Sequence, residues 1–177
     1  MSIVGNRSTE PHGAAIACTN SRVLLDHCTI ADNYAGQQGA ALRLVNSEVS
    51  LTNSIVWGNH PGEILLDILS YASIAYTDIG SGNTGLGNLN TDPLFARRGY
   101  WVDLSDPQAV WMEGDYHLQS QAGRWDPITG TWTRDDVTSP CIDAGNPMGP
   151  VGPEPAPNGG RANLGAYGTS TQASKSP

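Results

Sequence analysis

A sequence repeat of about 25 residues near the start of the chain constrains its fold more than any other feature, because a fixed period in this range indicates stacked units. The segment 12–30 aligns with the segment 38–56, so that Gly13-Ala14-Ala15-Ile16 falls on Gly39-Ala40-Ala41-Leu42 and Cys28-Thr29-Ile30 falls on Ser54-Ile55-Val56. A third, shorter copy places Ala72-Ser73-Ile74 under Val49-Ser50-Leu51. No such unit can bury its apolar face alone.

Each copy of the repeat carries the pattern of short β-strands. Val23 and Leu25 alternate with Leu24 and Asp26, and similar segments are separated by Gly, Asn, Ser or Asp. Such period-2 alternation over four to six residues is typical of strands. A propeller blade needs about 40 residues or more, and a leucine-rich repeat would show a longer Leu pattern with a helical segment. The sequence therefore predicts an all-β parallel β-helix of about three coils within residues 1–80.

Asparagines recur at one place in the repeat and predict a ladder. Asn6, Asn33 and Asn59 occupy equivalent positions of successive coils. Asparagine tolerates a left-handed backbone, and its amide can bond to the amides above and below it. The same alignment stacks Ile30, Val56 and Ile79 into one apolar column.

Composition and charge agree with this fold class and exclude some functions. Charged residues make up 15% of the chain, which also has 21 Gly and 12 Pro, so a turn-rich all-β protein is favoured over a helical bundle. The formal net charge is -8, and Lys175 is the single lysine. Binding to nucleic acid or to anionic lipid needs a basic surface, which this composition does not provide. No apolar run approaches the roughly 20 residues of a membrane span.

The three cysteines give no even disulfide framework. Cys18 and Cys28 lie one strand apart in a single repeat. Either could be a small apolar core residue, and a bridge between them would be open to them in an oxidising compartment. Cys141 has no obvious partner.

The composition and the apolar pattern of the sequence change at Gly80. The glycine-rich segment 80–88 has no apolar periodicity, and no helix follows it, so a phosphate-binding loop is disfavoured. We expect residues 81–177 to form a loop-rich capping region in the same structural domain as the coils of residues 1–80. Because Gly5-Asn6 looks like the tail of a repeat, the chain is expected to be the C-terminal part of a longer protein.

Three motifs of this second half carry a resemblance. They are Asp92-Pro93-Leu94-Phe95, Ser139-Pro140-Cys141-Ile142-Asp143-Ala144-Gly145 and Gly165-Ala166-Tyr167. Together with the Gly-Ala-hydrophobic coils, they make the chain resemble the C-terminal part of bacterial right-handed parallel β-helix repeat proteins of the pectin-lyase-like superfamily. The resemblance implies a right-handed β-helix and a secreted or cell-surface location. It leaves the activity open, because that superfamily holds lyases, hydrolases, adhesins and passive surface proteins.

A catalytic site on the coils would need ionisable side chains in stacked columns. Asp26 aligns with Thr52 and Ala75, so no column holds the two carboxylates of a glycosidase. Lyases need a base near neutral pH, for which His27 and Arg43 are weak candidates. Arg22 aligned with Glu48 is read as a cross-strand surface ion pair.

Two other polar sets carry weaker signals. Asp32, Asp67 and Asp78 could contribute to a Ca²⁺ site, but they have no repeat spacing, and solvated turn aspartates are the ordinary reading. No other cofactor is indicated. Ser139, His117 and Asp143 could supply a nucleophile triad, but the chain lacks a nucleophile elbow, and Ser139 precedes a proline.

Four of the five tryptophans lie in the second half, and they are the candidate ligand-binding residues. Exposed, they would form a stacking platform for sugars, with Asp135 and Asp136 as hydrogen-bond acceptors; packed, they would form a lid over the last coil. The segment 125–132 is predicted to be a hairpin with a Pro/Gly turn. The rings concerned are Trp101, Trp111, Trp125 and Trp132.

These observations favour a non-catalytic capping end of an exported or cell-surface β-helix protein that binds a polysaccharide. The alternative is a polysaccharide lyase or glycoside hydrolase whose catalytic coils lie partly in a missing N-terminal portion, and a passive stalk stands between the two. The unpaired strand edges of the first coil also predict end-to-end self-association.

Overall fold

The computed structural model describes residues 1–9, 13–36 and 40–177, and the regular elements within them are all β-strands. Accordingly, the described residues contain no helix of the length and apolarity that a membrane crossing requires. The expectation of an all-β protein with parallel sheets is confirmed.

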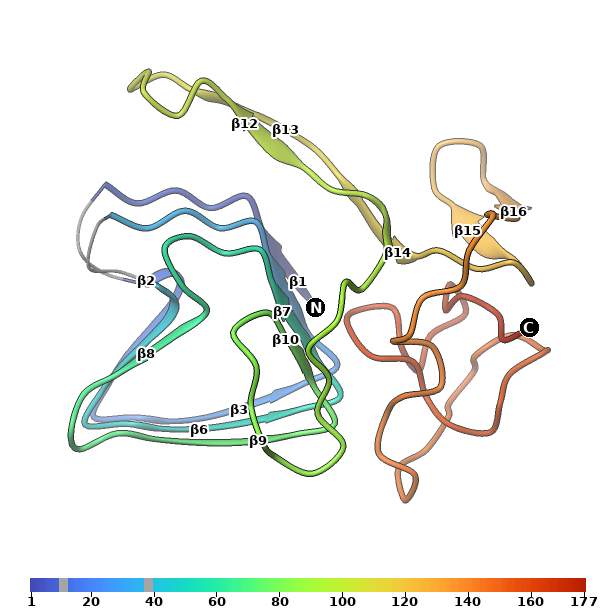
Figure 1. Cartoon of the computed structure of the whole chain (residues 1–177), viewed down its shortest axis with the longest axis horizontal. Helices are drawn as coiled ribbons and strands as arrows, with labels where there is room; N and C mark the ends of the chain where they lie inside the picture. Colours follow the sequence, from blue (N-terminus) through green and yellow to red (C-terminus); the bar gives the residue numbers. More distant parts are fainter. Residues whose placement is uncertain (10–12, 37–39) are drawn as a thin grey trace.

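Residues 1–79 build three parallel sheets that the chain visits in turn. In Figure 1 the three sets of strands lie along the sides of a triangular outline, with successive passes stacked on one another. The sheet that faces the second half of the chain is called the flank sheet. It consists of β1 (Ser2–Val4), β4 (Thr29–Ala31), β7 (Ile55–Trp57) and β10 (Asp78–Ile79). The second sheet consists of β2 (Gly13–Thr19), β5 (Ala40–Val45) and β8 (Ile64–Leu66), and the third of β3 (Arg22–Asp26), β6 (Glu48–Thr52) and β9 (Tyr71–Ala75).

The register of these sheets follows the sequence repeat. Ile30 pairs with Val56 and Val56 with Ile79, as the alignment predicts. One difference occurs at the start of β2, where Gly13 pairs with Ala40 and the register shifts before Ile16 meets its expected partner. The expected partner of Gly13, Gly39, lies outside the described residues, as do His12 and Gln38.

Three corners of the coils use the same local device. A residue with left-handed backbone turns the chain, and the next residue of the first coil binds its equivalent in the second coil. At one corner the turning residues are Gly5, Asp32 and Gly58, with φ between 56° and 69°. The residues that follow the turning residues in the three corners are Asn6, Asn33 and Asn59; Ser21 and Ser47; and Cys28, Ser54 and Thr77.

The asparagine ladder runs through the first of these corners. Asn6 Nδ2 donates to Asn33 Oδ1 at 2.9 Å, and Asn33 Nδ2 donates to Asn59 Oδ1 at 2.9 Å. The backbone N–H groups of Asn6 and Asn33 donate to the same two oxygens. The polar groups that this turn buries are therefore paired with asparagine side chains of the neighbouring coil.

The apolar side chains that point into the coils form the first core. Leu42, Leu51 and Val56 are no more than 1% exposed. Fully burying such a side chain contributes about 1.5–3 kcal/mol to stability. Since the strands of one coil are short, this core exists only when the coils are stacked.

Residues 81–177, called the tail, lie beside the coils. A second core joins the outward side chains of the flank sheet, Ala31 and Ile55, to Phe95, Leu118 and Leu164. Figure 1 shows the C-terminal segments next to β1, β7 and β10. The predicted aromatic lid over the last coil is therefore not what the structure shows. The tail packs sideways on the apolar outer face of the flank sheet. After the third coil, the segment 82–91 returns to the coils, and its Leu89 forms a parallel β-bridge with Asp78.

The tail contains three antiparallel strand pairs. A projecting hairpin of residues 99–114, called the arm, and a second hairpin of residues 124–133 both carry a tryptophan pair. The predicted hairpin at 125–132 is confirmed by the second of them. The pairs are β11 (Phe95–Arg97) with β14 (Asp115–Leu118), β12 (Tyr100–Val102) with β13 (Val110–Met112), and β15 (Arg124–Asp126) with β16 (Thr131–Thr133).

All three cysteines are buried and free. Cys18 and Cys28 belong to the coil core, so the bridge that the sequence leaves open is not formed. Cys141 lies in the second core, and its thiol donates to Asp78 Oδ2 at 3.2 Å. Burial raises the pKa values of both groups. This contact fastens the tail to the flank sheet.

Candidate functional site

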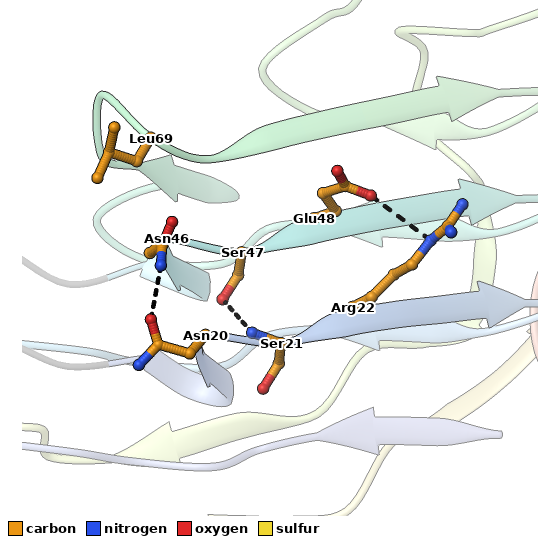
Figure 2. Close-up of a pocket in the computed structure, with 7 residues that line it drawn as sticks. All are labelled: Asn20, Ser21, Arg22, Asn46, Ser47, Glu48 and Leu69. Atoms are coloured by element: carbon orange, nitrogen blue, oxygen red, sulfur yellow. Dashed lines mark hydrogen bonds and ion pairs between the residues drawn. The ribbon is translucent and has the colours of Figure 1, made fainter.

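A polar hollow lies at one corner of the coils. It has a volume of about 430 Å³ and is lined by residues 20–22, 46–48 and Leu69. Figure 2 shows that its polar groups bind one another: Asn46 Nδ2 donates to Asn20 Oδ1, Ser21 N donates to Ser47 Oγ, and Arg22 pairs with Glu48. The hollow is thus the outer surface of a ladder, and its described lining includes no aromatic residue.

Another hollow, called the groove, lies between the arm and the coils and has a volume of about 270 Å³. It is more apolar than the corner hollow, and aromatic and imidazole rings make up much of its wall. Its coil side comes from two neighbouring coils, and its other side from the arm. The lining residues are Asp32, Asn33, Tyr34, Gly58, His60, Arg98, Gly99, Tyr100, Trp101, Leu104 and Trp111.

The rings of the groove are held in two pairs. Tyr34 and His60 are aligned through the coil stack by backbone bridges, and their ring centroids lie 4.9 Å apart with an angle of 11° between the planes. Trp101 and Trp111 are cross-strand partners on the arm, with ring centroids 5.5 Å apart. Aromatic pairs prefer stacked and tilted arrangements at such separations.

The polar floor of the groove is a charged network around Asp32. Arg98 Nε donates to Asp32 Oδ1 at 3.0 Å, and Tyr116 Oη donates to Asp32 Oδ2 at 2.7 Å. The hydrogen bond to Asp32 raises the pKa of Arg98, and burial together with the same carboxylate raises the pKa of Tyr116 above its ordinary range. At neutral pH Arg98 is therefore cationic and Tyr116 keeps its proton. About half of the Arg98 side chain stays exposed, so its remaining N–H groups can reach a ligand.

Glu63 lies near this network and has a strongly perturbed pKa. Burial raises the pKa of Glu63 to about 7. Its Oε2 accepts from Asn59 Nδ2 at 2.5 Å, which places the carboxyl group at the end of the asparagine ladder. Glu63 is 7% exposed and does not line the groove. Burial is the main cause of the raised pKa, because the hydrogen bond from Asn59 acts in the opposite direction.

The structure divides the candidate tryptophans between two places. Trp101 and Trp111 line the groove, whereas Trp125 and Trp132 form a pair on the second hairpin, 5.8 Å apart and edge to face. Asp135 accepts from Arg124 Nε at 3.0 Å and from the N–H of Ser120. Asp136 is exposed. The four tryptophans therefore form two separate pairs, and Asp135 already has partners.

The weak catalytic candidates are not brought together. His27 turns a corner of the first coil with φ 47°, and burial lowers its pKa. Arg43 lies on β5 in register with Ala17 and Leu65. The Arg22–Glu48 pair is present at 3.5 Å, and both side chains are more than half exposed.

The aspartates considered for calcium are dispersed. Asp32 binds Arg98, Asp67 accepts from Ser70 Oγ at 2.5 Å, and Asp78 accepts from Cys141. Within the described part of the chain, His, Cys, Asp and Glu side chains form no cluster of three suited to a metal ion.

The residues considered for a nucleophile triad serve separate contacts. Ser139 Oγ donates to Pro93 O at 2.6 Å. His117 bonds to Asp115 through Nδ1, and Asp143 accepts from Ser176 Oγ. The three side chains therefore stabilise the tail in different places.

Sequence reasoning missed the coil side of the groove. It assigns Asp32 to a calcium site alone and assigns Tyr34, His60 and Arg98 to no ligand site. A signal exists for the two rings, because Tyr34 and His60 are separated by one length of the repeat. Arg98 carries no such signal, since only the tertiary packing of the tail brings it to Asp32.

Comparison with known proteins adds one finding. Residues 75–145, less than half of the chain, match the model of a family described as disaggregatase related. The match runs from the end of β9 through the arm and the second hairpin to Gly145. The comparisons find no matching curated protein and no matching solved structure.

Proposed function

We propose that this chain is the end of a right-handed parallel β-helix whose groove binds a polysaccharide without cleaving it. Three parallel sheets visited in cyclic order support the β-helix. Parallel connections within a sheet are right-handed in about 98% of cases, which supports the hand. The tail then closes the β-helix from its flank. The resemblance to pectin-lyase-like repeat proteins supports a secreted or cell-surface location.

The observation that carries the proposal is the ring content of the groove. Tyr34 and His60 form a stacked pair on one side, which presents ring edges and the free outer faces of the stack, and Trp101 stands on the other side. Sugar rings present apolar C–H faces and polar edges, so aromatic walls with a polar floor suit them. At that floor the half-exposed Arg98 supplies N–H donors, and Asp32, whose side chain is 7% exposed, holds Arg98 in place.

Cleavage would need two carboxyl groups, or a base, that face the ligand. The carboxylate in the groove, Asp32, is already bound by Arg98 and Tyr116. Glu63, whose pKa would suit a general acid, is buried behind the ladder. Beside Asp32 the described lining of the groove contains no second carboxyl group, and its imidazole, that of His60, is stacked on Tyr34.

The test is affinity electrophoresis of the whole chain in native gels that contain neutral or acidic polysaccharides. The wild type is expected to be retarded by at least one of them. His60→Ala, at an exposed position, and Trp101→Ala should each weaken the binding at least about tenfold through lost stacking. Trp132→Ala on the second hairpin is the matched control and should bind as the wild type does.

Three results would contradict the proposal. Loss of retardation in Trp132→Ala with normal binding in His60→Ala would move the site to the second hairpin. New reducing ends or unsaturated products from a bound polysaccharide would show an enzyme. A wild type that no polysaccharide retards would remove the ligand itself.

A further inference from the structure

We infer that the arm is a clamp that opens to admit a ligand to the groove and closes on it through a latch at Arg7. The inference rests on the proposed function for the identity of the ligand, whereas the opening of the arm is a property of the chain alone. Four features of the arm support it.

The arm is joined to the rest of the tail by two glycines that face each other. A Cβ on Gly114 would collide with the backbone nitrogen of Gly99 and would lie 2.7 Å from the carbonyl oxygen of Arg97. The two chain segments therefore pass backbone against backbone at the base of the arm. Small residues at such a base can absorb the backbone rotations of a hinge.

The strands of the arm pack on each other and make few contacts with any other strand. Figure 1 shows β12 and β13 projecting along one side of the coils, away from the rest of the tail. A two-stranded hairpin without a third strand is at best marginally stable on its own. The arm is held on the first coil by side-chain contacts, such as that of the Trp111 ring with Gly5, so its movement as a unit would break side-chain contacts and no pairing with another described strand.

The tip of the arm is held by one side chain of the first coil. Arg7 Nη1 donates to Asp106 O and Arg7 Nη2 donates to Leu104 O, both at 2.9 Å. Both bonds lie at the surface, where water competes with them. A latch of two exposed hydrogen bonds is strong enough to favour the closed arm and weak enough to release it.

The closed arm buries N–H donors that have no acceptor. The ring nitrogens of Trp101 and Trp111 and Nε of Arg7 are buried, and none of them has a hydrogen-bond partner among the described residues. Arg7 Cζ lies 6.0 Å from the centre of the Trp101 ring, so these groups are neighbours. Unpaired buried donors destabilise the state that contains them. Hydroxyl and ring oxygens of a saccharide are acceptors, and because these donors are buried in the ligand-free chain, a saccharide would reach them only after the arm opens. The arm would then close on the ligand with the donors paired.

The experiment is hydroxyl-radical footprinting of the whole chain, with oxidation measured at each tryptophan. Without any ligand, Arg7→Ala should raise the oxidation rate of Trp111 at least about fivefold, because the latch bonds involve a charged group. Trp125 on the second hairpin should not change. Arg22→Ala, which removes another arginine of the first coil, should leave both tryptophans as in the wild type. Arg7→Lys, which keeps the charge but loses the paired geometry, should give an intermediate rate.

The second part of the footprinting experiment adds a polysaccharide fragment that binds in the gel assay. That fragment should protect Trp101 and Trp111 in the wild type, and it should dissociate at least about fivefold faster from Arg7→Ala. An unchanged oxidation rate of Trp111 in Arg7→Ala would overturn the clamp, whatever the ligand result. If no polysaccharide binds, the proposed function fails, and the oxidation rates without ligand still decide whether the arm opens.

Discussion

The molecule contains two tryptophan hairpins of similar construction that have different surroundings. In the arm, Trp101 pairs with Trp111 across the strands, and in the second hairpin Trp125 pairs with Trp132. The arm is tied down at its tip by a coil residue and covers a groove. The second hairpin is fastened at its base, and Lys175 Nζ lies 4.4 Å from the centre of the Trp132 ring. A cross-strand tryptophan pair in a hairpin therefore does not by itself tell whether the pair lines a groove or packs within the fold.

The largest expected effect concerns the fastening of the second hairpin. Arg124 binds Asp115 at 3.2 Å and Asp135 at 3.0 Å, and none of the three side chains is more than 16% exposed. Arg124→Ala leaves two carboxylates without this partner and should lower the free energy of unfolding by about 3 kcal/mol. Chemical denaturation measures the loss. Arg134→Ala, at an exposed position beside the hairpin, is the control and should change stability by less than about 0.5 kcal/mol.

A buried carboxyl group of the third coil, that of Glu63, should make the stability of the chain depend on pH. Because burial raises the pKa of Glu63 to about 7, the folded chain holds a proton there that the unfolded chain releases at lower pH. The contribution of Glu63 to stability is present at low pH and is lost as the pH rises from its unfolded value to about 7. The loss is on the order of 3 kcal/mol.

Glu63→Gln isolates this contribution. The variant should match the wild type at pH 4.5, the ordinary pKa of the group, and be more stable than it at pH 8. Part of the dependence of the unfolding free energy on pH should remain in Glu63→Gln, because burial also raises the pKa values of Asp78 and Glu154. Denaturation curves at a series of pH values give the free energy of unfolding of both proteins, and an identical dependence on pH in the two would contradict the raised pKa of Glu63.

Two glycines with left-handed backbone give a smaller and sharper comparison of the hairpins. Gly5 (φ 63°) lies directly under the Trp111 ring, whereas Gly130 (φ 65°) in the second hairpin has open space where a Cβ would be. Gly130→Ala should cost about 1 kcal/mol through backbone strain alone. Gly5→Ala carries the same strain and also pushes on the indole, so it should cost about 2–3 kcal/mol. Thermal unfolding of both variants measures their losses of stability. Equal losses in Gly5→Ala and Gly130→Ala would show that the arm does not rest on the first coil.

The smallest effect is expected at Lys175. Its ammonium group lies over the Trp132 ring, and a cation–π contact of a partly exposed lysine contributes about 0.5–1 kcal/mol. Lys175→Ala should therefore lower the free energy of unfolding by that amount and leave polysaccharide binding unchanged. Lys175→Arg keeps the cation and should be as stable as the wild type. Denaturation curves of the two variants measure the difference.

The coils could be predicted from the sequence because one physical rule repeats in them. The alignment of the repeats alone predicts the pairing of Ile30 with Val56, and the structure confirms it. The two ladders that follow Asn20, Asn46 and Asn53 were missed, although an Asn-Ser pair occurs at each of these three positions and marks a turn followed by an acceptor. The register shift after Gly13 had no signal, since it depends on how the corner closes.

The tail could not be predicted in the same way. The sequence leaves two arrangements open for its aromatic residues, an exposed sugar platform and a lid over the last coil. Neither anticipates that the flank sheet is apolar on both faces, as Ile55 and Ala31 show. The Trp125–Trp132 hairpin was found because its turn is short and carries Pro and Gly. The arm is not predicted, because its strands are joined by a longer segment, 103–109, which carries Asp106-Pro107 but no glycine. The groove depends on Asp32 meeting Arg98, which lies far along the chain, and no local pattern indicates that contact.

The most direct test of the account is a titration of the ¹⁵N-labelled chain with an oligosaccharide of the retained polysaccharide, followed at the tryptophan indole N–H resonances. The account predicts that the indole signals of Trp101 and Trp111 shift with the same saturation curve while those of Trp57, Trp125 and Trp132 stay in place. Shifts at Trp125 or Trp132 with Trp101 and Trp111 unmoved would contradict it.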